Sequence, residues 1–126
     1  MRKQISTGSP MEKAAGYSRA VVQGDFCFVA GTTGYDYETM EMPGSVEAQT
    51  RNALSTIERT LKEAGFSTAD IVRVQYFICD AADAGRVFPV VGEFFADIRP
   101  AATMLVTGLI RPEMRIEIEA TAMRAD

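Results

Sequence analysis

The segment at residues 115–123 constrains the fold more than any other part of the chain, because apolar and polar side chains alternate along it. A period of two residues is typical of a β-strand that turns one face to a hydrophobic core. The apolar row is Ile116, Ile118, Ala120 and Ala122, and the polar row is Arg115, Glu117, Glu119 and Thr121. We therefore expect a core-facing strand whose other face presents the carboxylates of Glu117 and Glu119, about 7 Å apart.

The rest of the chain predicts further strands, rich in β-branched and aromatic residues. They are expected at residues 17–22, 26–30, 72–79 and 103–107. A Gly24-Asp25 turn joins the first two as a hairpin, and Gly108 and Pro112 predict a short turn before the final strand. Residues 9–16 and 31–38 are expected to be loops, and residues 5–9 predict no more than an edge strand.

Two segments have the apolar spacing of amphipathic helices. The first is expected to run from an N-cap at Ser45 to Ala64, where Gly65 ends it. The second should begin at Asp80 or Asp83 and reach about Ile98. Its core-facing side chains are expected to be Val87, Val91 and Phe94, widened by Phe88, Val90 and Phe95.

This order of elements predicts one α+β domain over residues 1–126, in which a mixed β-sheet carries two helices on one face. Along the 72–79 strand the side chains expected to face the helices are Val72, Val74, Tyr76 and Ile78. The opposite sheet face would carry Arg73, Gln75, Phe77, Arg115, Glu117, Glu119 and Thr121. That face mixes apolar with charged side chains, so it is too apolar to face only solvent and too polar to form a core. We therefore expect it to lie between subunits.

The composition of the chain argues against some classes of partner. The net charge is −4 and the isoelectric point about 4.9, which argues against a nucleic-acid partner. No apolar run suggests a signal peptide or a membrane span, so a cytoplasmic protein with no membrane partner is expected. Cys27 and Cys79 lie in strand-like runs and are expected to be small buried hydrophobes.

The chain contains no histidine. Catalysis by Ser-His-Asp or Cys-His groups, histidine zinc sites and a ribonuclease with paired histidines are therefore excluded. Any general acid or base must be Asp, Glu, Lys, Tyr, Cys, a terminus or water. We expect no metal and no cofactor.

Three stretches of the chain match a known family in order and spacing. They are Gly16-Tyr17-Ser18-Arg19-Ala20-Val21, then Phe28-Val29-Ala30-Gly31, and then Pro100-Ala101-Ala102-Thr103 with the Ile-Glu-Ile-Glu-Ala run at 116–120. They resemble the Gly-Pro-Tyr-Ser-x-Ala-Val, the Phe-Val-Ser-Gly and the closing signature of the RidA/YjgF family of reactive-intermediate deaminases, over nearly the whole chain. The resemblance implies a chorismate-mutase-like fold and a homotrimer with clefts between neighbouring subunits.

The resemblance also implies a chemistry. In the family, a small imine or enamine of an amino acid binds in the cleft and is hydrolysed to ammonia and a keto acid without metal or cofactor. The glutamate matching Glu117 positions or activates water, and an arginine after Pro-Ala grips the substrate carboxylate. The matching ligand-binding positions here are Tyr17, Ala30, Gly31, Phe88, Ala102 and Thr103. Two of these residues also have a purely structural interpretation. Tyr17 would then be a tyrosine packed at the start of a strand, and Glu117 would lie on a strand face exposed to solvent.

The chain departs from the family pattern at three of these positions. Ala102 replaces the arginine, Ala30 replaces a frequent serine, and Phe88 stands where many relatives have asparagine, unless Phe88 simply packs in the core. Arg99 and Arg111 are near in sequence and are either surface residues or substitutes for the missing cation.

Three hypotheses follow. The first is a family member whose ligand is not an amino-acid imine, because all three replacements make the pocket less polar. The second is an active deaminase that uses Arg99 or Arg111. The third is a regulatory or chaperone-like binding protein without catalysis. An endoribonuclease, an activity attached to the family's name, is the least favoured reading because the chain is acidic and lacks histidine.

Overall fold

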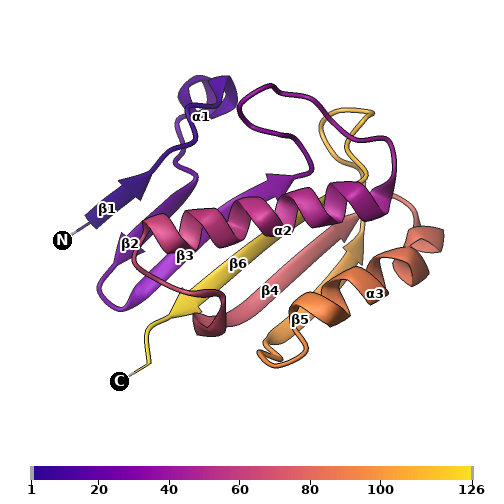
Figure 1. Ribbon diagram of the computed structural model, residues 1–126. Coiled ribbons are helices and arrows are strands. Elements are labelled where there is room, and N and C mark those ends of the chain that lie inside the picture. Colours follow the sequence, from indigo (N-terminus) through magenta and orange to yellow (C-terminus); the bar gives the residue numbers. More distant parts are fainter. Residues whose placement is uncertain (1, 126) are drawn as a thin grey trace.

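Six strands form one mixed sheet in the computed structural model, which describes residues 2–125. The strand order is β1-β2-β3-β6-β4-β5; β4 and β5 are parallel and all other neighbours are antiparallel. The elements are β1 (Arg2–Ile5), α1 (Pro10–Ala15), β2 (Ala20–Gln23), β3 (Phe26–Thr33), α2 (Val46–Glu63), η1 (Thr68–Asp70), β4 (Ile71–Ile78), η2 (Ala81–Asp83), α3 (Ala84–Phe94), β5 (Ala101–Val106) and β6 (Ile116–Met123). Helices α2 and α3 lie across one face of the sheet, which confirms the predicted α+β class (Figure 1).

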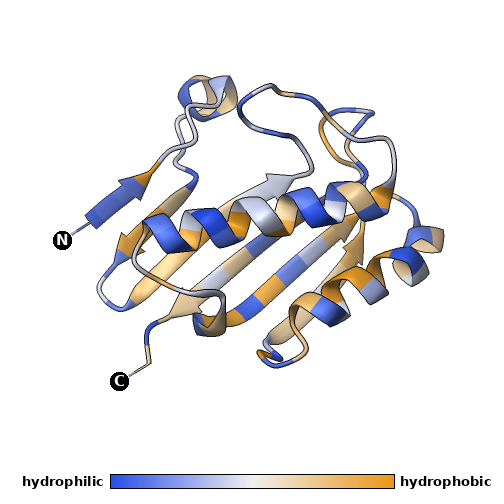
Figure 2. Ribbon diagram, viewed as in Figure 1, coloured by the Kyte–Doolittle hydropathy of each residue, from blue (hydrophilic) through white to orange (hydrophobic). Residues whose placement is uncertain are grey.

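Strand β6 is central, paired with β3 on one side and β4 on the other. Its apolar row is buried as predicted, with Ile116, Ile118 and Ala122 fully shielded from solvent and Ala120 nearly so. Figure 2 shows the alternation as bands of hydrophilic and hydrophobic colour along the central strands. The apolar row packs beneath α2, whose Val46, Ala53, Ile57 and Leu61 form the other half of the core.

Helix α2 confirms its predicted limits. The Ser45 hydroxyl accepts a hydrogen bond from the Ala48 amide at 3.1 Å, and Gly65 follows the helix with a φ of +84°. Helix α3 is shorter than expected: Asp80 caps the 3₁₀ turn η2, and the helix ends at Phe94. Phe88 on α3 is 57% exposed, so its expected place in the core is wrong.

The N-terminal region contains a helix where the sequence predicts a loop. Ser9 caps α1, Pro10 is its first residue, and Gly16 ends it in the left-handed conformation. These are ordinary start and stop signals, but the helix is only six residues long and has little room for an apolar period. Strand β3 is also longer than predicted, because it continues through Gly31 to Thr33.

Three details of the sheet differ from expectation. A register shift between Ile71 and Arg73 leaves Val72 47% exposed, so Ile71 faces the core in its place. Strands β5 and β6 are consecutive in sequence but β4 lies between them, so residues 107–115 form a connection rather than a tight turn. Cys27 is buried as predicted, whereas Cys79 is exposed and donates to the Met114 carbonyl.

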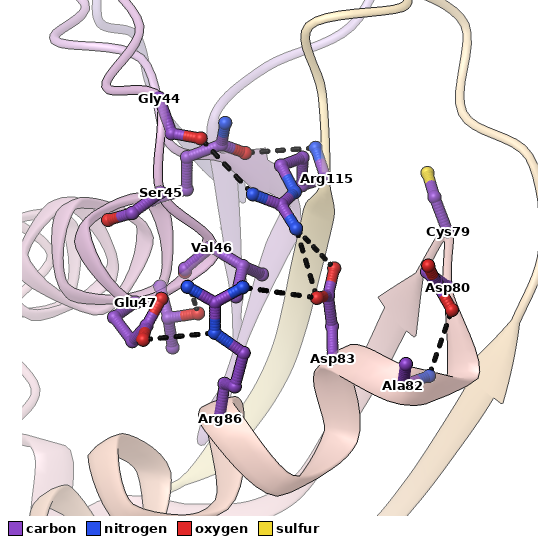
Figure 3. A network of polar contacts seen from close by, with 12 residues as sticks. Gly44, Ser45, Val46, Glu47, Cys79, Asp80, Ala82, Asp83, Arg86 and Arg115 are labelled. Atoms are coloured by element: carbon purple, nitrogen blue, oxygen red, sulfur yellow. Dashed lines mark hydrogen bonds and ion pairs between the residues drawn. The ribbon is translucent and has the colours of Figure 1, made fainter.

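Arg115 lies on the helix side rather than on the open sheet face. Its Nη2 contacts both carboxylate oxygens of Asp83 at 3.0 Å, and its Nη1 donates to the Gly44 carbonyl (Figure 3). Arg86 adds a longer contact to Asp83 and pairs with Glu47 at 3.2 Å. This network joins the start of β6 to the N-terminal ends of α2 and α3.

We expect Arg115→Met to destabilise the protein by about 1–3 kcal/mol, because the side chain of Asp83 is 6% exposed and would lose its bidentate partner. Arg86→Met is the matched control. Its side chain is 51% exposed, so its loss should cost less than about 1 kcal/mol. Urea unfolding of both variants measures the difference, and equal losses would contradict this account of the network.

Candidate functional site

A pocket of about 500 Å³ opens at one end of the sheet, beside the Glu117 carboxylate. Figure 1 shows α1, the connection after β3 and the connection between β5 and β6 gathered at this end. The lining residues are Met11, Ala14, Ala15, Tyr17, Ala30, Gly31, Thr33, Tyr37, Ile110, Met114 and Glu117. Four predicted site residues, Tyr17, Ala30, Gly31 and Glu117, therefore lie around one cavity.

Gly31 permits the close approach of Glu117. A Cβ atom on Gly31 would lie 2.5 Å from Oε2 of Glu117, and Cβ atoms in proteins essentially never come this close to a non-bonded atom. The pairing of β3 with β6 shifts register between Val29 and Thr32, so Ala30 and Gly31 bulge beside the carboxylate. Such bulges re-aim side chains next to active sites. Glycine at this position follows from the need to seat Glu117 against the backbone.

The Glu117 carboxyl group lies in a partly desolvated environment. Burial raises its pKa above the usual range, the nearby charge of Arg19 opposes this, and the like charge of Glu119 adds to it. With the Gln75 amide oriented to satisfy its neighbours, Gln75 donates to Glu119 at 2.9 Å and accepts from Arg73 at 2.7 Å. Glu119 is thus held on the open sheet face, and Glu117 is the carboxylate that lines the pocket.

Gln49 of α2 anchors the connection between β5 and β6. Its amide nitrogen donates to the carbonyls of Pro43 and Glu113, and its oxygen accepts from the Arg115 amide at 2.9 Å. Gln49 is 1% exposed, so these bonds form away from competing water. They fix the connection that carries Ile110 and Met114 into the pocket wall.

Two residues of the site, Arg19 and Tyr37, are not among the positions predicted from the sequence. Arg19 is 1% exposed, and its Nη2 donates to the Gly31 carbonyl at 2.8 Å. Its guanidinium lies near the rings of Tyr17 and Tyr37, and the Tyr37 hydroxyl accepts from the Thr33 amide at 3.1 Å. The sequence signal for Arg19 is weak: it is a charged residue directly before the apolar run Ala20-Val21-Val22. No pattern in the sequence marks Tyr37.

The remaining predicted positions lie elsewhere in the protomer. Ala102 and Thr103 are on β5, at the sheet edge far from β3, and Phe88 is exposed on α3. Register places Ala102 on the helix side with Val74, and Thr103 on the open face with Gln75. One protomer thus does not bring these three residues to the Glu117 pocket.

The two candidate substitute cations differ in position. Phe77 pairs with both Leu105 and Glu117, so these two residues lie at the same level of the sheet. Arg99 lies two residues before the start of β5, toward the end of that strand away from Leu105. Arg111 lies in the connection whose Ile110 and Met114 line the pocket. Burial and the hydrogen bond that the Tyr35 hydroxyl donates to Glu113 at 2.6 Å raise the pKa of Tyr35, and the positive charge of Arg111 opposes this rise.

A mixed sheet with two helices on one face and a carboxylate pocket at its end defines a chorismate-mutase-like α+β domain. A family profile described as Endoribonuclease L-PSP matches residues 7–124. A crystal structure of a YjgF/YER057c/UK114 family member from Mycobacterium tuberculosis superposes with a TM-score of 0.90 at 42% identity, covering 98% of this chain and 100% of that one.

Two further relatives cover nearly the same span. A RutC family protein from Pyrococcus abyssi is 32% identical, with 98% of this chain and 99% of the relative covered. A rat protein named 2-iminobutanoate/2-iminopropanoate deaminase is 30% identical over 98% of this chain and 91% of its own length. The chain belongs to the RidA/YjgF family, as the motifs predicted.

Proposed function

We propose that the protein binds a small imine or enamine without a carboxylate in the Glu117 pocket and hydrolyses it to ammonia and a carbonyl compound. One observation carries the proposal: the lining residues that the structure describes include a carboxylate but no Lys or Arg. A ligand carboxylate would therefore meet Glu117 without a lining cation to offset the repulsion. The many apolar lining atoms favour an aliphatic or aromatic body.

Glu117 has the position and environment of a general base. It would accept a proton from water as the water oxygen bonds to the carbon of the protonated imine and the C=N electron pair moves to nitrogen, which gives an amino alcohol. The protonated Glu117 would then give its proton to the amine nitrogen, and the carboxylate would accept the hydroxyl proton as the C–N bond breaks and the carbonyl forms. Ammonia leaves, and Glu117 releases that proton to solvent. A carboxyl pKa raised by burial brings the group closer to neutral pH, where it can act in both directions.

The complete cleft is proposed to form between subunits of a homotrimer. The open sheet face carries half-exposed apolar side chains beside polar ones, and the Phe26 and Phe28 rings stack on it at 5.6 Å. Pairing with a second copy would cover this face. We propose that Phe88, Ala102 and Thr103 reach the Glu117 pocket from the neighbouring protomer.

Light scattering coupled to gel filtration should therefore give about three times the 13.7 kDa chain mass. The physical reason is the apolar area left on the open sheet face of one protomer. A stable monomer at micromolar concentration would contradict both the trimer and the shared cleft.

Binding of stable analogues tests the ligand class. Phenethylamine and phenylalanine differ only by a carboxylate, so they form a matched pair. Phenethylamine should shift the backbone amide resonances of Gly31 and Glu117 at lower concentration than phenylalanine does. Equal or tighter binding of phenylalanine would contradict the proposal.

The second candidate function is deamination of amino-acid imines, supported by the name of the rat relative. It requires a substitute cation. Arg111 is the better placed candidate within one protomer, because its neighbours Ile110 and Met114 line the pocket. Arg99 would have to come from an adjacent subunit. Regulatory or chaperone-like binding without turnover is the third candidate, and ribonuclease activity remains the least supported.

A further inference from the structure

Arg19 is a buried cation without an ion pair. Its side chain is 1% exposed, yet within the described residues no carboxylate oxygen lies within 4.0 Å of its guanidinium. Within the described residues, the guanidinium makes one hydrogen bond, from Nη2 to the Gly31 carbonyl, and its Nε has no partner. Burial of an unpaired charge is costly, and the field of such a charge acts strongly on its ionisable neighbours. The charge of Arg19 acts to lower the pKa of both Glu12 and Glu117.

The guanidinium lies directly behind the pocket wall. Its Cζ is 5.8 Å from the Tyr17 ring centre and 5.3 Å from the Tyr37 ring centre, within range of cation–π attraction. Both rings and Gly31 line the pocket, whereas Arg19 does not. Gly31 separates the two charges, because Arg19 binds its carbonyl while Glu117 packs against its Cα.

Other charged or titratable groups around Glu117 are negative, neutral or engaged elsewhere. Glu119, on the same strand, is a like charge held by Gln75. Tyr17 faces the pocket as a neutral phenol, since burial raises its pKa. Glu12 of α1 is bound by the Ser6 hydroxyl and by the hydroxyl and amide of Thr7. Among the described residues, Arg19 is the cation whose field reaches Glu117.

We propose that Arg19 is a positioning residue for the proposed reaction: its buried guanidinium keeps the Glu117 carboxylate negatively charged and ready to act as a base, without contacting the ligand. This inference rests on the proposed function of the pocket. A cation behind the wall stabilises the base but offers no donor to a substrate carboxylate. The pocket can therefore hold an anionic base and still lack an arginine clamp.

The test is a carbon-13 NMR titration of the Glu117 side-chain carboxyl in the full-length protein. Arg19→Gln should raise the Glu117 midpoint by about one pH unit or more, the effect expected for removal of a nearby opposite charge. Arg19→Lys should restore most of the wild-type midpoint. Arg124→Gln is the matched control, because Arg124 stacks on Phe66 at 4.1 Å but is exposed and away from the pocket. It should leave the midpoint unchanged.

A second measurement covers the case in which Arg19→Gln does not fold. In the wild type, the side-chain NMR resonances of Arg19 should shift with the Glu117 midpoint, and Glu117→Gln should abolish that step. An unchanged Glu117 midpoint in folded Arg19→Gln, or Arg19 resonances that ignore the Glu117 titration, would overturn the proposal.

These titrations need no ligand, so the two ideas fail separately. A raised midpoint in Arg19→Gln supports the role of Arg19 as counter-ion even where imine hydrolysis is not detected. The opposite result is also distinguishable. If the wild type hydrolyses the imine but Arg19→Gln leaves the Glu117 midpoint unchanged, the inference about Arg19 is overturned and the proposed function stands.

Discussion

Wild-type protein is expected to hydrolyse 2-iminopropanoate at close to the uncatalysed rate, and Ala102→Arg should raise that rate. The reason is that Ala102 stands where the resemblance to the family implies an arginine that binds the substrate carboxylate. Loss of one partner of a buried charge pair costs about 2–5 kcal/mol, roughly 30- to several-thousand-fold in catalytic efficiency. Glu117 increases the penalty, because an unpaired negative substrate would approach a second negative charge.

The experiment generates 2-iminopropanoate from alanine with an amino-acid oxidase and follows its disappearance. Ala102→Gln is the control, since glutamine adds a polar, hydrogen-bonding side chain without the charge and should give no gain. Wild-type turnover equal to that of a relative with the Pro-Ala-Arg motif would contradict the prediction. Alanine variants of Arg99 and Arg111 would then identify the substitute cation.

Glu117→Gln should lower the hydrolysis of a carboxylate-free imine by about 10²–10⁴-fold, the contribution of a positioned general base. Glutamine keeps the shape of the side chain but cannot accept the proton from water. Glu119→Gln is the control, because Glu119 is held by Gln75 outside the pocket and its loss should have little effect. Similar losses in both variants would assign the effect to the strand rather than to Glu117.

Glu117→Gln should not lower the stability of the folded protein at neutral pH. Burial raises the folded-state pKa of Glu117 above its ordinary value of 4.5, so the ionised carboxylate opposes folding. The stabilising contribution of the protonated form is present below the unfolded-state pKa and is lost as the pH rises through the folded-state pKa. Glu117→Gln should therefore match or exceed the wild-type melting temperature at about pH 7.5, with a smaller difference at about pH 4. A lower melting temperature at the higher pH would contradict the desolvated setting of Glu117.

The parts of the fold with strong periodicity were predictable from sequence. Strand β6 and helix α2 match expectation because burial of one face fixes their side-chain pattern. Val72 was misplaced because a register shift in the β4–β6 pairing breaks the alternation, and no local residue announces that shift. Helix α1 was missed because six residues carry caps but almost no period.

The site was only partly predictable for a related reason. Tyr17, Gly31 and Glu117 could be chosen because family motifs mark them, and they do line one pocket. Arg19 occupies a variable position of its motif, and its importance arises from contacts with Gly31, Tyr17 and Tyr37 that only the folded chain creates. The family motifs also mark Ala102, yet the chain does not bring Ala102 or Phe88 to this pocket; their proposed place in it requires a second subunit, which no pattern within one chain specifies.

The most direct measurement compares two imines that differ only by a carboxylate. A flavin amine oxidase generates 2-phenylethanimine from phenethylamine, an amino-acid oxidase generates 2-imino-3-phenylpropanoate from phenylalanine, and ammonia release is followed with and without the protein. The pocket of Glu117, with no lining Lys or Arg among the described residues, predicts acceleration of 2-phenylethanimine hydrolysis and little or none for its carboxylated counterpart. Faster hydrolysis of 2-imino-3-phenylpropanoate, or no acceleration of either imine, would contradict the account.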